Sequence, residues 1–198
     1  MRVGPEEYAA LPLRAHALLA DAPLHDVWAL DLPGGGPGRS VADVRQLLER
    51  EPIAEAGGAV RLLFGLRRGL GRVFGWDAEA AAPGPPDASS YVHRLSAADR
   101  AASLVEPGRR EGLFRTLFVT ERESIAEVRN ATVHAFLVYA LSEREGGYRL
   151  HWAVHVKPVG RITAWYMRGI DPFRRWLVYP ALLRRLRRAW ERELGGRG

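Results

Sequence analysis

The sequence predicts an α+β fold in which a curved antiparallel sheet wraps around one long C-terminal helix. From Gly112 onward, short β-branched runs with a period of two follow one another, as is typical of antiparallel strands. A long amphipathic helix ends the chain, and a sheet of that size needs an element to cover one of its faces. The chain has 198 residues, which suits one domain, so we expect a single unit over residues 1–198.

The first half of the chain predicts one strand and two helices. An extension over residues 1–22 precedes a strand at 24–33 (LHDVWALDLP), which ends at a proline and a run of glycines. In SVADVRQLLER, Ser40 and Asp43 match a reciprocal helix cap, and apolar residues follow at helical spacing. A second amphipathic helix is expected over residues 59–76.

A loop rich in alanine and proline follows over residues 76–90, and the next two motifs are short. YVHRL at 91–95 is interpreted as a strand, and SAADRAA at 96–102 as a capped turn of helix. The remaining strands are predicted in LFRTLFVTE, SIAEVRNA, TVHAFLVYAL, YRLHWAVHVKP and RITAWYM, with SEREGG as a hairpin turn.

The terminal helix is expected to begin with Asp171 as N-cap and Pro172 in its first turn, and to end at Gly195-Gly196. Pro180 lacks an amide proton and should kink the helix where it bends over the sheet. Arginines occupy the remaining positions of the helix. Its apolar stripe comprises Phe173, Trp176, Leu177, Tyr179, Leu182, Leu183, Leu186 and Trp190.

This order of elements is that of the helix-grip fold. On the motifs HDVWALDLPG, NATVHAFLVYAL and ITAWYMRGIDPFRRWLVYPALLRRLRRAW, the chain resembles an uncharacterised bacterial family of domains of unknown function within the START-like, polyketide-cyclase-like (SRPBCC) superfamily. The resemblance leaves residues 76–112 without a counterpart. It implies a pocket between sheet and helix for an apolar or amphipathic small molecule, and it supplies no catalytic residues.

Composition excludes several classes of protein. The chain has no cysteine, so it forms neither disulfides nor thiolate metal sites. No secretory signal and no apolar run long enough to span a membrane is present, so we expect a cytoplasmic protein. Nucleotide-binding glycine motifs and the GxSxG and HExxH motifs are absent from the sequence, and we expect no cofactor.

Six histidines raise the question of a metal site. His151 and His155 are four residues apart, which on a strand separates their Cα atoms by about 13 Å, too far for one ion. We therefore expect no metal and interpret both as polar residues on the outer face of the sheet. Both faces of the strand that carries His134 are apolar, so the facing of His134 stays open.

Alternation places Trp152 and Val154 on the face that looks toward the core or pocket. The predicted function is the binding of a lipid-like or polyketide-like molecule, and the facing of residues 165 and 166 stays open. A cyclase- or dehydratase-like enzyme is the alternative, with His134 as its acid–base residue. The predicted pocket residues are Phe136, Trp152, Val154, Trp165, Tyr166, Trp176 and Leu183.

The net charge of +6 is concentrated at the C-terminus. Residues 157–198 carry +8 and the rest of the chain −2. A basic amphipathic helix is also typical of proteins that bind an anionic membrane surface, which is the second alternative. Nucleic acid is not an expected partner, because no nucleic-acid-binding motif accompanies the charge. The arginines that would contact the membrane are Arg184, Arg185, Arg187 and Arg188.

Overall fold

The computed structural model describes residues 1–50, 86–130 and 133–194. Its centre is a six-stranded antiparallel sheet with the order β1-β6-β5-β4-β3-β2. The strands are β1 (Leu24–Pro33), β2 (Arg110–Glu111), β3 (Phe114–Val119), β4 (Glu123–Arg129), β5 (His134–Arg144) and β6 (Gly147–Lys157). The prediction of an α+β fold with an antiparallel sheet and a C-terminal helix is confirmed.

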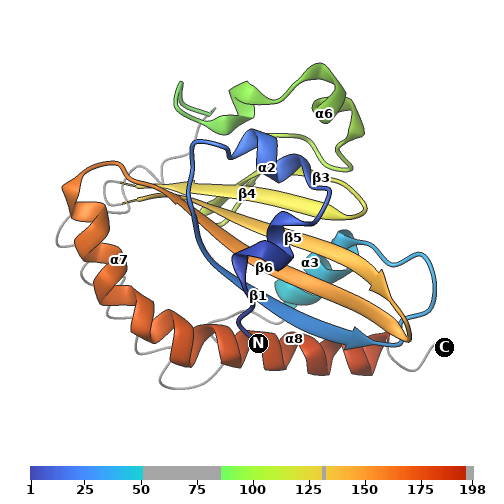
Figure 1. Ribbon diagram of the computed structural model, residues 1–198. Coiled ribbons are helices and arrows are strands. Elements are labelled where there is room, and N and C mark those ends of the chain that lie inside the picture. Colours follow the sequence, from blue (N-terminus) through green and yellow to red (C-terminus); the bar gives the residue numbers. More distant parts are fainter. Residues whose placement is uncertain (51–85, 131–132, 195–198) are drawn as a thin grey trace.

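Helical segments lie on both faces of the sheet (Figure 1). On one side are the short helices of the N-terminal segment and the segment that contains α6; on the other are α3 and the C-terminal helix. The helices are α1 (Pro5–Ala9), α2 (Arg14–Leu18), α3 (Val41–Arg50), η2 (Tyr91–Arg94), α6 (Ala97–Ala102), α7 (Arg161–Phe173), η3 (Arg174–Val178) and α8 (Tyr179–Glu193).

Several local predictions are confirmed. Asp43 accepts a hydrogen bond from the Ser40 amide at 2.8 Å, which completes the expected cap of α3. Ser96 and Asp99 form the capping box that begins α6. The hairpin between β5 and β6 turns at Gly146, whose φ of 73° suits a residue without a side chain.

Two predicted strands are wrong. YVHRL forms the 3₁₀ helix η2, because the Ser90 side chain caps the Val92 amide and Tyr91 packs against the sheet. RITAWYM forms the first half of α7, so the terminal helix begins at Arg161 rather than at Asp171. The β-branched and aromatic residues of this segment suggested a strand, but helical packing overrides such a propensity. The helix expected at 59–76 and the helix end at Gly195-Gly196 lie outside the described residues, as does most of the loop predicted at 76–90.

The C-terminal helix is continuous but irregular. Five residues of π-helix, η3, join α7 to α8, and Pro180 follows within the first turn of α8. A proline provides no amide for the carbonyl four residues earlier, and the wider π-turn accommodates this loss. The bend expected at Pro180 is thus present as a π-turn, and the helix curves below the sheet from α7 into α8 (Figure 1).

The N-terminal extension is part of the sheet's covering. The Met1 ammonium group and the Val3 amide donate to the carbonyls of Ala29 and Val27, so these first residues lie along the free edge of β1. Covering an edge strand prevents it from pairing with another chain. Further along the same extension, Tyr8 is buried in the core on the face of the sheet opposite the C-terminal helix. Among the described residues, no helix has the length and apolar character needed to cross a bilayer.

Candidate functional site

An aromatic layer fills the space between the sheet and the C-terminal helix. Trp28 on β1 and Trp152 on β6 are directly opposite one another, so their side chains share one face of the sheet. Tyr139 on β5 meets Trp152 edge-on, with 4.7 Å between the ring centroids. From α8, the Tyr179 ring lies 5.5 Å from the Trp28 ring and 6.1 Å from the Trp152 ring. This layer provides a large, rigid apolar surface.

A carboxylate is buried beside these rings. Asp26 is directly opposite Val154 and two residues before Trp28, so it faces the same layer. Its side chain is fully buried, and neither of its carboxylate oxygens has a hydrogen-bond partner. Its nearest charged neighbour is Arg174, with 3.6 Å between Nη2 and Oδ1. Burial raises the pKa of Asp26, and the nearby Arg174 only partly opposes that rise.

Arg174 organises the polar side of the layer. It lies in η3, and its guanidinium group donates to the Tyr179 hydroxyl and, at 3.2 Å, to Asp171. Asp171 is also hydrogen-bonded to His25, at 2.8 Å from Nε2 to Oδ1. The predicted N-cap residue therefore links β1 to the helix instead of beginning the helix. Burial alone would lower the pKa of Arg174, but Tyr179, Asp26 and Asp171 together raise it.

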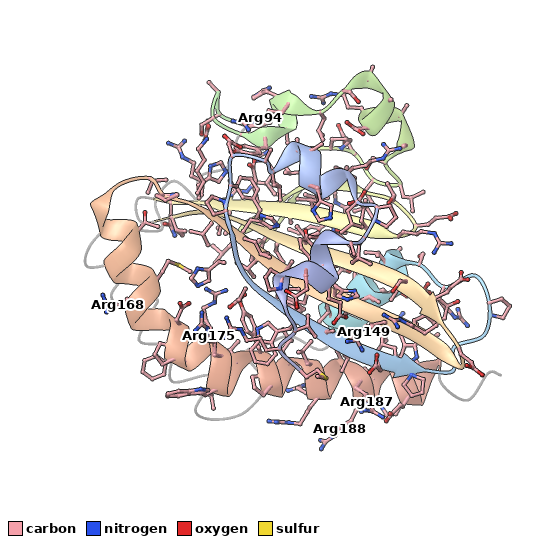
Figure 2. The ribbon with its side chains drawn as sticks, in the orientation of Figure 1. Arg94, Arg149, Arg168, Arg175, Arg187 and Arg188 are labelled. Carbon is pink, nitrogen blue, oxygen red and sulfur yellow. The ribbon has the colours of Figure 1, made fainter. Side chains whose placement is uncertain are left out.

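The π-turn explains why an arginine faces the sheet here. A wider turn rotates the chain through fewer degrees per residue, so positions in and before η3 are displaced around the helix relative to α8. Arg174 consequently faces Asp26. Trp176 is displaced outward and is 82% exposed, so it lies outside the buried stripe in which the sequence placed it. Arg175 lies on the sheet-facing side of the helix (Figure 2), 3.6 Å from Asp171.

Several donors in this layer have no acceptor. The indole N–H groups of Trp28 and Trp152 are buried without a hydrogen-bond partner, and so is Nε of Arg175. Most buried polar groups in proteins are hydrogen-bonded, so a cluster of exceptions needs an explanation. Trp190 offers a contrast, because its indole donates to the Pro33 carbonyl at 3.0 Å. The layer therefore combines unused acceptors on Asp26 with unused donors on two tryptophans.

The predicted pocket residues do not all meet. Trp152, Val154 and Leu183 lie in the layer between sheet and helix. Phe136 is directly opposite His155 and packs in the core of the other face, against Tyr91. Both faces of β5 are apolar, so alternation alone did not assign Phe136 to a side. The side chains of the other two predicted residues, Trp165 and Tyr166, lie outside the described residues.

His134 lies on the face opposite the aromatic layer. Its Nε2 is hydrogen-bonded to Glu127 at 3.0 Å, a carboxylate partner that the sequence did not reveal. Glu127 also accepts from the Ser90 hydroxyl and the Tyr91 amide, and thus holds the segment around η2 to the sheet. A hollow of about 50 Å³ borders Ser90, Glu127 and His134. The enzyme alternative required His134 and Trp152 to share one site, and they do not, because they lie on opposite faces of the sheet.

The other two histidines of the sheet are buried, not exposed. The interpretation of His151 and His155 as polar residues of an exposed outer face is wrong, because the N-terminal segment covers that face. His151 contacts Glu7, and His155 contacts the Ala22 carbonyl and the Tyr8 hydroxyl. Within the described ranges, no three histidine or carboxylate side chains are grouped so that they could hold a metal ion.

Asp26, Arg174 and Asp171 are site residues that were not predicted from the sequence. One signal was present, because Asp26 shares its alternation face with Trp28 and Leu30, and a carboxylate on an apolar face is unusual. No comparable signal marked Arg174, one of many arginines in the terminal helix.

A comparison with models of protein families matches residues 18–181 to the family described as "Protein of unknown function (DUF2867)". The chain belongs to the DUF2867 family. The matched region of this DUF2867 protein contains the whole polar cluster, from His25 and Asp26 to Arg174 and Tyr179, and ends before Trp190. Searches among curated proteins and among solved structures give no match.

Proposed function

We propose that this protein binds an apolar or amphipathic small molecule between the sheet and its C-terminal helix, with the polar end of the ligand at Asp26. The observation that carries the proposal is the buried carboxylate of Asp26, both of whose oxygens lack a hydrogen-bond partner. Leaving such a group unsatisfied costs about 1–3 kcal/mol, more when it is charged. A buried group without a partner needs an explanation, and a ligand that bonds to Asp26 supplies one.

The unused donors and acceptors define the polar end of the ligand. Asp26 needs a donor, and the indole groups of Trp28 and Trp152 need acceptors. A neutral group that carries both, such as a hydroxyl or an amide, would satisfy all three residues. The rings of Tyr139 and Tyr179 offer apolar contact to the rest of the molecule. This is the usual composition of a small-molecule site, which is mostly apolar with few polar groups.

The order of the elements supports the same proposal. A sheet curved around a C-terminal helix is the arrangement of the helix-grip fold, and on this basis we assign the chain to the START-like (SRPBCC) superfamily. In that assignment the space between sheet and helix is the ligand pocket. The helix could open from the sheet around the irregular turn η3, where the regular helical hydrogen bonds are interrupted.

The test combines ligand affinity with stability. A dansyl-labelled long-chain alcohol is titrated against the wild type, Asp26→Asn and Asp31→Asn, and urea unfolding of each is followed at pH 7. Asp31 is on the same strand as Asp26 but has an exposed side chain, so Asp31→Asn is the matched control. We expect Asp26→Asn to weaken binding roughly tenfold, as the loss of a hydrogen bond to a charged group would.

Stability distinguishes binding from a structural role. Because burial raises the pKa of Asp26, the ionised carboxylate destabilises the fold at neutral pH, and Asp26→Asn should unfold at equal or higher urea concentration. Lower affinity with undiminished stability supports the proposal. Unchanged affinity for the probe in Asp26→Asn, or a loss of affinity that only follows a loss of stability, would overturn it.

A further inference from the structure

Two large apolar side chains are exposed on the outer surface of the C-terminal helix. Trp176 is 82% exposed and Phe173 is 49% exposed. They lie three residues apart, so they are neighbours on the helix surface. A single exposed apolar residue is common, but an indole almost fully in water gains free energy from any apolar environment that covers it.

Unpaired arginines lie on the same helix. Arg168, Arg184 and Arg188 are exposed, and none forms an ion pair or hydrogen bond with another described residue. Some exposed arginines outside this helix do have an acidic partner, as Arg94 has Asp21. The concentration of positive charge toward the C-terminus is therefore not neutralised locally along this helix.

The geometry brings these residues to one surface. Trp176, Arg184 and Arg188 are all exposed, so they lie on the side of the helix away from its buried residues. Arg184 and Arg188 are four residues apart in α8 and are neighbours there. The buried residues of α8, such as Leu182 and Leu186, occupy the opposite side. Arg187 and Arg188 project from the helix away from the sheet (Figure 2). We call Phe173, Trp176, Arg184 and Arg188 the outer helix surface.

We propose that the outer helix surface docks on an anionic lipid bilayer, with Trp176 and Phe173 entering the headgroup boundary and Arg184 and Arg188 contacting lipid phosphates. Tryptophan is enriched at the level of lipid headgroups because its ring is apolar and its N–H is polar. Arginines near an anionic leaflet add electrostatic attraction. Nucleic acid would satisfy the charge but would leave the two apolar side chains without an apolar environment.

Of the four arginines that the sequence assigned to the membrane surface, Arg187 is hydrogen-bonded to Glu191 at 2.8 Å and Arg185 also has a partner. Arg184 and Arg188 therefore carry the proposal. This surface faces away from the aromatic layer around Asp26. The docking proposal is therefore independent of the proposed ligand site, and the failure of one leaves the other standing.

The test is co-sedimentation of the full chain with phosphatidylcholine vesicles that contain phosphatidylglycerol, compared with phosphatidylcholine alone. We expect binding only to the anionic vesicles, and weaker binding at high salt. Trp176→Ala should lower the partition coefficient roughly tenfold, because it removes the main inserted side chain. The double variant Arg184→Glu/Arg188→Glu should lower it by more than about tenfold.

A matched control separates this surface from net charge. Arg109→Glu/Arg144→Glu changes the net charge by the same amount at exposed positions outside the helix, and it should bind clearly better than Arg184→Glu/Arg188→Glu. Equal losses in the two double variants would overturn the proposal, as would unchanged binding in Trp176→Ala. Sedimentation velocity supplies one more outcome: a wild-type dimer that Trp176→Ala dissociates would assign the surface to a second copy of the chain and overturn the proposal too.

Discussion

Replacing Trp190 with alanine tests how the C-terminal helix is held to the sheet. Trp190 is fully buried, its indole donates to the Pro33 carbonyl at the end of β1, and its ring meets Tyr148 at 5.7 Å between centroids. Removing a buried tryptophan side chain costs about 3–5 kcal/mol. Whole domains are stable by only about 5–15 kcal/mol, so the variant should unfold at a much lower urea concentration.

The contact between Trp190 and Gly35 allows a second step. Gly35 has a φ of 95°, and a Cβ added there would lie 2.7 Å from Cζ2 of Trp190. Gly35→Ala should therefore destabilise the wild type both by backbone strain and by this clash. In a Trp190→Phe background the clash is relieved and only the strain persists, so the two substitutions should couple by about 1 kcal/mol.

The assay is urea unfolding followed by far-ultraviolet circular dichroism, which does not depend on the removed tryptophan. Trp176→Ala is the control, because a side chain that is 82% exposed should contribute within about 0.5 kcal/mol. Similar free energies of unfolding for Trp190→Ala and Trp176→Ala would refute the packing of α8 described above. Strictly additive effects of Gly35→Ala and Trp190→Phe would refute the close approach of Gly35.

Three further predictions concern buried ionisable groups. Burial raises the pKa of Asp26, so ionisation of its carboxyl group lowers the stability of the fold as pH increases. Asp26→Asn should therefore have a higher free energy of unfolding than the wild type at pH 7, and the difference should be smaller at pH 4. Urea unfolding at the two pH values measures this difference. Burial lowers the pKa of both His151 and His155, so the wild type should lose stability as pH falls from 7.5 to 5.5. The loss should be smaller in His155→Gln. Equal slopes of the free energy of unfolding against pH in the two proteins would contradict this. Glu127→Ala removes the hydrogen-bond partner of Ser90, Tyr91 and His134 and should lower the free energy of unfolding by about 3 kcal/mol. Amide hydrogen exchange in η2 should also become faster. Unchanged exchange in η2 would show that Glu127 does not hold this segment to the sheet.

Local signals in the sequence predicted the elements that they directly specify. β1 ends at Pro33 as its composition indicates, and α3 and α6 begin at the caps that Ser40 and Ser96 provide. The same kind of reasoning placed a helix start at Asp171, although that residue accepts hydrogen bonds from His25 and Arg174 inside a longer helix. An N-cap motif indicates only that a side chain is able to accept a hydrogen bond from a helix N-terminus. The groups that surround the side chain in the folded protein decide which hydrogen bond forms.

The candidate site was predicted only in part. Trp152, Val154 and Leu183 were placed in the layer between sheet and helix by alternation and helical periodicity, and the structure has them there. Phe136 lies on the other face because β5 is apolar on both sides and carries no pattern that distinguishes them. Trp176 is displaced by the π-turn, which shifts the helical phase that periodicity assumes to be constant.

By itself, the sequence determined the α+β composition, the antiparallel strands and the amphipathic C-terminal helix, because each depends on the spacing of residues near one another in the chain. Only the tertiary structure decided that the N-terminal segment buries His151 and His155, that Glu127 receives His134, and that Arg174 meets Asp26 from a position nearly 150 residues away. These contacts depend on which face of the sheet each segment covers. The face that each segment covers depends on how the whole chain buries its apolar surface, and it cannot be predicted from the spacing of neighbouring residues.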